Sequence, residues 1–475
     1  MLNSQSFTMP SRRSFLKSSA GMCGALIAGT PWTSALAAAP VLTVASRTLE
    51  VNKKAATVFS VLGSNGKPGM VMREGDRFLG DLLNDAGEPL QMHWHGQVKA
   101  PANQDRARPD GGALAVGLTD AHDFELTAGT HWMHSHSLSE QQLLAAPMVA
   151  REKDAGDVQD VVIMLHDFAF RPPQDIFSEL GAGVGAHAGQ GAGGGMMGKM
   201  MPGGMMSMTH ANDVKYDAFL ANDRTLDDPE IVMVEKAGRV RLRIINGGTA
   251  TAFFVSTPGL NSSCIAVDGS SCLPVSLPAY PIAQGQRIDL LVEIPQEGGA
   301  FPVLAQVEGD RSVTGIVLAT AGASISKILG TADAPQGLTD LAFEAQLRAT
   351  NPLAEKPADQ SFMVMLGEEP GYRWTINGRA HGEHQPFDVR KGERVEMTFM
   401  NPTTMMHPMH LHGHHFQVVA IGGQRFSGAL RDTVIVPAHN PVTIAFDANQ
   451  KGEWFLHCHH LYHMAGGMMT EVRIS

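Results

Sequence analysis

The chain has 475 residues, of which 17% are charged, and its formal net charge is −11 at pH 7. This length is enough for about three domains. The acidic balance argues against a nucleic-acid-binding protein and favours cationic partners.

The first 37 residues have the pattern of an export signal. Residues 11–17 (SRRSFLK) carry a twin arginine, residues 20–27 are mildly apolar, and Ala35-Leu36-Ala37 is a small-residue cleavage site. The apolar stretch is too short to cross a bilayer, and no later segment is long and apolar enough. We therefore predict a twin-arginine signal peptide over residues 1–37 and a periplasmic protein without membrane insertion.

A His-x-His spacing occurs four times in the chain. In a β-strand, residues i and i+2 point to one face and the residue between them points to the other face. Each pair therefore presents two imidazoles side by side, as a bidentate metal ligand. The pairs are His93 and His95, His134 and His136, His410 and His412, and His457 and His459.

A methionine- and glycine-rich segment covers residues 181–210. Glycine, lysine and proline surround its methionines, which indicates a flexible segment rather than a packed core. Thioethers are soft ligands that select Cu(I), so we predict copper capture, with an inert loop as the alternative. The seven methionines in question are Met196, Met197, Met200, Met201, Met205, Met206 and Met208.

Two cysteines, Cys264 and Cys272, lie eight residues apart in the middle of the chain. In an oxidising compartment they could form a disulfide across a hairpin. Spacing alone does not define the geometry that a disulfide needs. A disulfide and two free thiols both stay open at this point.

The last His-x-His pair has Cys458 at its centre, so its sulfur points away from the two histidines, toward a different metal site. His463 and Met468 follow five and ten residues later, and His407 lies just before the third pair. Two histidines, a thiolate and a weak thioether are the ligands of a blue-copper electron-transfer site. Zinc is disfavoured because methionine is a poor zinc ligand and no second cysteine lies nearby.

Short strand-like runs separated by glycine and proline dominate the chain, for example Arg239–Ile244. A short helical pattern occurs at Thr339–Arg348. Repeated short strands predict β-sandwiches. We expect an all-β fold with domains at 40–165, 166–335, which contains the methionine-rich segment, and 345–475.

The four histidine motifs resemble, in composition and in order, those of the multicopper oxidases. The matching stretches are residues 93–96 (HWHG), 132–136 (WMHSH), 407–413 (HPMHLHG) and 457–468. The resemblance implies three cupredoxin-like Greek-key β-sandwich domains and four copper ions, with a trinuclear cluster between domains 1 and 3. It assigns His407, Cys458, His463 and Met468 to type 1 copper, His93 and His410 to type 2, and His95, His134, His136, His412, His457 and His459 to the type 3 pair.

The histidines outside this set receive structural interpretations. We expect surface or loop positions for His122, His131, His166, His381, His384 and His439. For His414, His415 and His460, support of the metal ligands and a purely structural use both stay open.

The resemblance also implies an oxygen-dependent oxidoreductase. A donor would reduce the type 1 copper one electron at a time, and Cys458 would pass the electrons to His457 and His459, so that dioxygen is reduced to water. Asp110, in an Asp-Gly-Gly sequence, matches an acid that related oxidases use near the type 2 copper, and we expect it to supply protons. The alternative is a turn-forming aspartate. A second acid often follows the last type 1 histidine in such enzymes, but Met464 occupies that position here.

The methionine-rich segment resembles that of the cuprous oxidases of bacterial copper tolerance, although in the familiar version it lies in the third domain. Cu(I) is therefore the expected donor. A laccase-like oxidase of phenols or other small aromatic donors would share every copper ligand and stays open. A copper-sequestering protein is the third alternative, but storage needs no thiolate between two sites. We expect a monomer.

Overall fold

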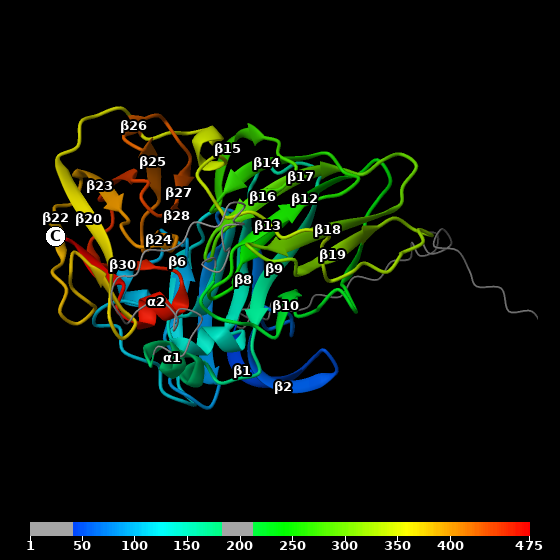
Figure 1. Ribbon diagram of the computed structural model, residues 1–475, viewed down its shortest axis with the longest axis horizontal. Coiled ribbons are helices and arrows are strands. Elements are labelled where there is room, and N and C mark those ends of the chain that lie inside the picture. The colour runs from blue at the N-terminus through cyan, green and yellow to red at the C-terminus, as the bar shows by residue number, and fades with distance from the viewer. Residues whose placement is uncertain (1–40, 183–211) are drawn as a thin grey trace, which may run out of the picture. The chain divides into compact units, whose positions relative to one another are not determined.

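Short β-strands make up almost all the regular structure of the computed structural model, which describes residues 41–182 and 212–475 (Figure 1). The α-helices in these ranges are α1 (Pro173–Gly181) and α2 (Leu461–Ala465). The predicted all-β fold class is confirmed. None of the helices in the described ranges is long and apolar enough to span a membrane. The predicted signal peptide and the methionines of residues 196–208 lie outside the described residues.

The first group of strands forms two four-stranded sheets, in the orders β2-β1-β4-β6 and β3-β8-β7-β5. The two sheets enclose an apolar core that includes Phe78, Phe124 and Met133. Buried and solvent-facing side chains alternate along β4, as expected for a strand with one face on a core. The strands are β1 (Val41–Val51), β2 (Lys54–Leu62), β3 (Met70–Arg73), β4 (Arg77–Asp85), β5 (Met92–His95), β6 (Thr119–Glu125), β7 (Gly129–Ser135) and β8 (Ala145–Arg151).

A second sandwich follows, with sheet orders β10-β9-β12-β17-β14-β15 and β11-β19-β18-β13-β16. Because β9 crosses the expected boundary at residue 165 and pairs with β10 and β12, we propose that this domain begins with β9. Cys264 and Cys272 lie in its core as free cysteines. The strands are β9 (Gln159–Phe168), β10 (Ala218–Ala221), β11 (Ile231–Met233), β12 (Arg239–Asn246), β13 (Phe253–Ser256), β14 (Ser262–Val267), β15 (Ser270–Val275), β16 (Tyr280–Ile282), β17 (Arg287–Glu293), β18 (Ala300–Val307) and β19 (Val313–Ala319).

The third sandwich has sheet orders β21-β20-β23-β29-β25-β26, with β27 beside β25, and β22-β31-β30-β24-β28. Its core includes Trp374, Phe399 and Cys458. The strands are β20 (Gln360–Glu369), β21 (Arg373–Ile376), β22 (Phe387–Val389), β23 (Arg394–Met400), β24 (His407–Leu411), β25 (Phe416–Ile421), β26 (Gln424–Arg425), β27 (Leu430–Arg431), β28 (Thr433–Val436), β29 (Val442–Asp447), β30 (Gly452–Cys458) and β31 (Met469–Ile474).

The connection between the second and third sandwiches is held by buried charges. Arg431 lies 3.1 Å from Asp268 of the second sandwich and 2.7 Å from Glu344 of the connection, and all three side chains are buried. The helix that the pattern at Thr339–Arg348 predicted does not form, because the structure has only a 3-10 turn there, at Glu344–Gln346. Phe343 enters the second core and Glu344 binds Arg431, so the segment follows its tertiary contacts rather than its local pattern.

Replacing Arg431 with methionine should lower the free energy of unfolding by about 3–5 kcal/mol, because Asp268 and Glu344 would remain buried without a cation. Urea unfolding of the copper-free protein measures this. The matched control is Arg425→Met, which breaks a surface ion pair with Glu396 and should cost less than about 1 kcal/mol. Equal losses would contradict the role given to the buried pairs.

Candidate metal centres

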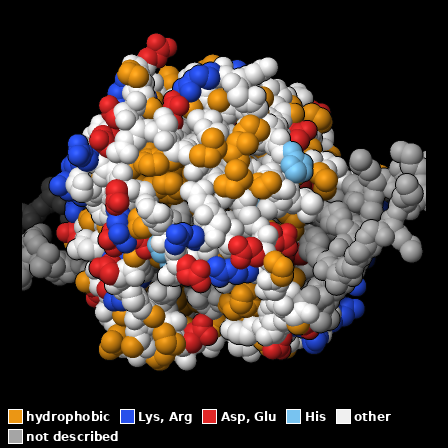
Figure 2. All heavy atoms as spheres, turned by 60° about the vertical axis from the view of Figure 1, so that its left-hand side comes forward, with side chains coloured by type: hydrophobic (Ala, Val, Ile, Leu, Met, Phe, Trp, Pro, Cys, Tyr) orange, Lys and Arg blue, Asp and Glu red, His pale blue; other side chains and the backbone are white. Residues whose placement is uncertain are grey.

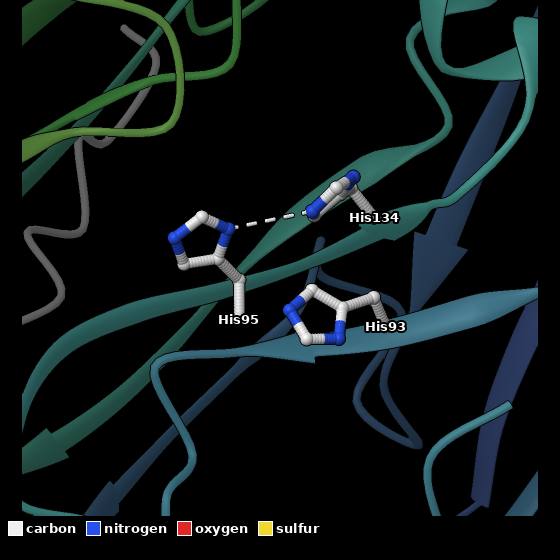
Figure 3. Close-up of side chains that lie close together, drawn as sticks. All are labelled: His93, His95 and His134. Carbon is white, nitrogen blue, oxygen red and sulfur yellow. Dashed lines mark hydrogen bonds between the residues drawn. The ribbon is translucent and has the colours of Figure 1, made fainter. Parts of the chain in front are cut away.

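Four strands bring the eight histidines of the His-x-His pairs together. His93 on β5 lies opposite His134 on β7, and His410 on β24 lies opposite His457 on β30. The ring centroids within each pair are 4.9–6.3 Å apart, and every one of these rings is buried. Figure 3 shows the rings of His93, His95 and His134 gathered beside the neighbouring strands β5 and β7 of one sheet. Half of the rings come from the first sandwich and half from the third.

The eight rings form one pair and two groups of three. In the pair, the Nε2 atoms of His93 and His410 are 3.2 Å apart. In one group, the Nε2 atom of His457 lies 3.2 Å from that of His136 and 3.1 Å from that of His412.

In the other group of three, His95 Nδ1 is 3.4 Å from His134 Nε2, and the ring of His459 lies 5.1 and 5.0 Å from these two rings. Both ring nitrogens of His459 lack a hydrogen-bond partner in the structure, so they are available to a metal. Each of the three sets draws ligands from both sandwiches. The pair matches the two histidines that the family resemblance assigns to type 2 copper, and the two groups of three together are the six that it assigns to the type 3 pair.

Hydrogen bonds hold the ring nitrogens that point away from the centre. This fixes the tautomer of each ring and aims the other nitrogen inward. Backbone carbonyls serve three rings: His410 Nδ1 donates to Asp432 (2.8 Å), His412 Nδ1 to Ala107 (3.1 Å) and His457 Nδ1 to Cys458 (2.9 Å). Carboxylates serve three more: His93 Nδ1 donates to Asp105 (2.7 Å), His134 Nδ1 to Glu140 (2.9 Å) and His95 Nε2 to Asp432 (3.0 Å).

Burial also lowers the pKa values of several of the eight rings. It lowers the pKa of His457 to about 3, and it lowers the pKa values of His136 and His412 well below the usual value, helped by the neighbouring imidazoles. Neutral imidazole is the form that binds a metal ion. These three rings are therefore neutral, and able to bind a metal, throughout the physiological pH range.

The acid beside the pair is Asp105, not the predicted Asp110. The Asp110 side chain is 75% exposed and pairs with Arg108 at 2.8 Å. Asp105 is buried and accepts the hydrogen bond from His93. Asp110 was predicted because of its Asp-Gly-Gly sequence. Asp105 is the first acidic residue after the His93/His95 pair, and no sequence motif marks it.

Arg287 of the second sandwich also reaches the centre, which the sequence reasoning did not foresee. Its guanidinium makes bonds of 2.6 and 2.5 Å to the carboxylate of Asp432, and its Nε donates to the carbonyl of Thr130 at 3.0 Å. Asp432 is the same residue that accepts from His95. The middle domain thus anchors the support of a metal ligand.

Several histidines that were expected on the surface or in loops are also buried. His122, His131 and His166 lie in the interior rather than on the surface or in loops. His131 contacts Arg287, its Nδ1 lying 3.2 Å from the guanidinium. Their burial depends on domain contacts that local spacing does not reveal.

The predicted blue-copper ligands meet at a separate point of the third sandwich. His407 Nδ1 and His463 Nδ1 are 3.2 Å apart, and Cys458 Sγ lies 3.7 and 3.8 Å from them. Met468 is fully buried in the same apolar core as Cys458, and its main chain bonds to Cys458 (3.0 Å) and His463 (2.9 Å). Burial raises the pKa of the Cys458 thiol, so its thiolate requires a metal.

The two sites are joined through one strand. Cys458 faces the single site, while its neighbours His457 and His459 face the eight-histidine centre, as the alternation of a strand predicts. The main chain around Cys458 is therefore a covalent path between the sites.

Comparison with known proteins agrees with this arrangement. Family models described as "Multicopper oxidase" match residues 43–154, 161–323 and 355–475. The chain belongs to the multicopper oxidase family. Its three sandwiches are therefore cupredoxin-like domains, and its enzyme class is that of the oxygen-dependent oxidoreductases.

Relatives and solved structures cover most of the chain. Multicopper oxidase MmcO of Mycobacterium tuberculosis is 28% identical over 427 residues, covering 86% of this chain and 82% of that protein. Copper resistance protein A of Escherichia coli is 25% identical, with 87% and 89% covered. The crystal structure of Fet3p, described as a multicopper oxidase that functions in iron import, has a TM-score of 0.75 at 17% identity, with 92% and 90% covered, and so shows the same fold.

Removing the carboxylate behind His134 should weaken the centre. We expect Glu140→Ala to lower its copper affinity roughly 10–100-fold, because the ring loses the acceptor that orients it. Copper retention against a chelator measures this. The control is Glu125→Ala, a surface glutamate paired with Lys99. If both variants retained copper equally, the support assigned to Glu140 would be wrong.

Proposed function

We propose that this multicopper oxidase oxidises Cu(I) with dioxygen, in copper tolerance, after export to the periplasm by the twin-arginine route. The twin-arginine pattern of residues 12 and 13 supports the route. Copper resistance protein A, a relative over most of both chains, supports the role in copper tolerance. The observation that carries the choice of donor is the position of the residues that flank the methionine-rich segment.

The flank after the segment contacts a type 1 ligand, and the flank before it is connected to that flank through Tyr372. After the segment, Asp213 lies 3.6 Å from Nε2 of His463 and 3.2 Å from Nε2 of His460. Before it, Phe177 in α1 packs against Tyr372 with ring centroids 6.3 Å apart, and the hydroxyl of Tyr372 donates to Asp213. Residues on both sides of the methionine-rich segment thus lie near the electron-accepting site, and thioethers select Cu(I), which together support Cu(I) as the donor.

We propose that the protein binds four copper ions, each at one of the groups of donor atoms described above. His407, Cys458, His463 and Met468 would hold type 1 copper, and the pair His93 and His410 would hold type 2. The type 3 ions would bind to His95, His134 and His459, and to His136, His412 and His457. Bound copper supplies one-electron oxidation of the donor and four-electron reduction of dioxygen to two waters.

The chain's own residues supply the electron path, orient the metal ligands and supply protons. Cys458 links the donor side to His457 and His459. Asp105 orients His93 and is our candidate for proton supply in place of Asp110, since it is the buried carboxylate beside the pair. Trp374 covers the type 1 ligands, its ring 3.9 Å from His463, and helps to exclude water.

The donor can be tested by removing residues 196–208. We expect kcat/KM for Cu(I) to fall roughly tenfold or more, equivalent to about 1.4 kcal/mol of lost transition-state stabilisation, with oxidation of 2,6-dimethoxyphenol unchanged. Oxygen uptake measures both. A variant with all seven methionines replaced by leucine keeps the length and removes only the thioethers, so it should behave like the deletion. Equal loss of phenol oxidation would favour a laccase-like enzyme instead.

The electron path can be tested at Cys458. Cys458→Ser should abolish the blue colour and oxygen uptake while the eight-histidine centre keeps its copper, because a serine hydroxyl is not a soft, strongly donating ligand. Absorbance, copper content and oxygen consumption report the three properties. The control is Cys264→Ser, another buried cysteine, which should keep both colour and uptake. Oxygen uptake by Cys458→Ser would refute the path.

A further inference from the structure

We propose that Met363, Met365 and Met400 form a Cu(I)-docking site on the outer face of the third domain. This inference rests on the proposed function and names a place on the described surface where its substrate would bind. Met363 and Met365 are 56% and 40% exposed, and Met400 is half-buried. Solvent exposure of two methionines two residues apart is unusual for side chains that normally fill cores.

The register of the sheet places the three side chains together. Strands β20 and β23 are parallel neighbours, with Val364 beside Phe399 and Met365 beside Met400. Val364 and Phe399 point into the core of the third domain, so the residues that alternate with them point outward. Met363, two residues before Met365, shares this outer face.

The spacing suits one ion. Neighbouring strands lie about 4.7–4.9 Å apart, and residues i and i+2 of a strand are about 6.5–7 Å apart. Methionine has three rotatable side-chain bonds, so three thioethers from these positions can converge. Thioethers select Cu(I) over harder ions, and they need no deprotonation to bind it.

The main chain near the three methionines is held firmly. The side chain of Asn377 accepts from the Met365 N–H at 2.8 Å and donates to the Met363 carbonyl at 3.3 Å. Beside Met363, the hydroxyls of Thr398 and Thr443 bond to each other at 3.0 Å. Figure 2, which brings the side of β20 and β23 toward the viewer, shows hydrophobic side chains exposed in groups among polar ones.

Each of the two strands leads to a residue that contacts a type 1 ligand. β20 pairs with β21, in which Trp374 packs on His463. β23 leads through residues 401–406 to His407, and Thr403 in that turn bonds to His407 Nε2 at 2.8 Å. A Cu(I) ion held by the three thioethers would therefore bind on the domain that accepts electrons, on strands that lead to contacts with His463 and His407.

The test is an anaerobic Cu(I) titration of the fully reduced, copper-loaded protein against a chromophoric Cu(I) chelator. We expect M363L/M365L to bind one Cu(I) fewer per chain, or to bind it at least tenfold more weakly. In oxygen uptake, the same variant should raise KM for Cu(I) severalfold with kcat unchanged. Leucine keeps the size and apolarity of methionine, so folding should be retained, and the blue colour checks this.

Met233→Leu is the matched control, since Met233 is 56% exposed on β11 without partner thioethers from neighbouring positions of the sheet. It should change neither Cu(I) binding nor KM. Unchanged Cu(I) binding by M363L/M365L would overturn the docking site while leaving Cu(I) oxidation intact. Conversely, loss of a bound Cu(I) in a protein that never oxidises Cu(I) would support the site and overturn the proposed function.

Discussion

The structure depends on one constraint: the histidines of the eight-histidine centre come from two different domains. Each of its three sets of rings takes ligands from the first and the third sandwich, although His93 and His410 are 317 residues apart in the chain. Metal–nitrogen bonds tolerate errors of only about 0.2 Å. The packing of the two domains must therefore be defined as closely as the interior of one domain.

Buried ionic contacts meet this demand. Arg287 of the middle domain holds Asp432 of the third, and Asp432 in turn orients His95 of the first, so one short chain of contacts crosses all three domains. Charges this deeply buried are costly unless they are paired, which gives the arrangement a strong preference for a single geometry. The middle domain, which carries no copper motif, is thus a structural partner of the metal centre.

The parts of the site that depend on local spacing were predictable. Alternation along a strand correctly placed each His-x-His pair on one face and turned Cys458 toward a second site. Contacts made by distant segments were not predictable, such as those of Arg287 and Asp432, because no periodic pattern encodes them. Asp110 was chosen because its sequence resembles a family motif, and Asp105 was not considered, yet the segment after β5 buries Asp105 and leaves Asp110 exposed. The helical pattern at 339–348 failed because the core contact of Phe343 outweighed helix propensity.

The most direct test of a metal centre shared between domains is anomalous diffraction at the copper edge from crystals of the copper-loaded protein. We predict one copper at His407, Cys458 and His463, and three more between the first and third domains, each bound by histidines of both. Copper at the single site alone, or an inner site with ligands from one domain only, would contradict this account.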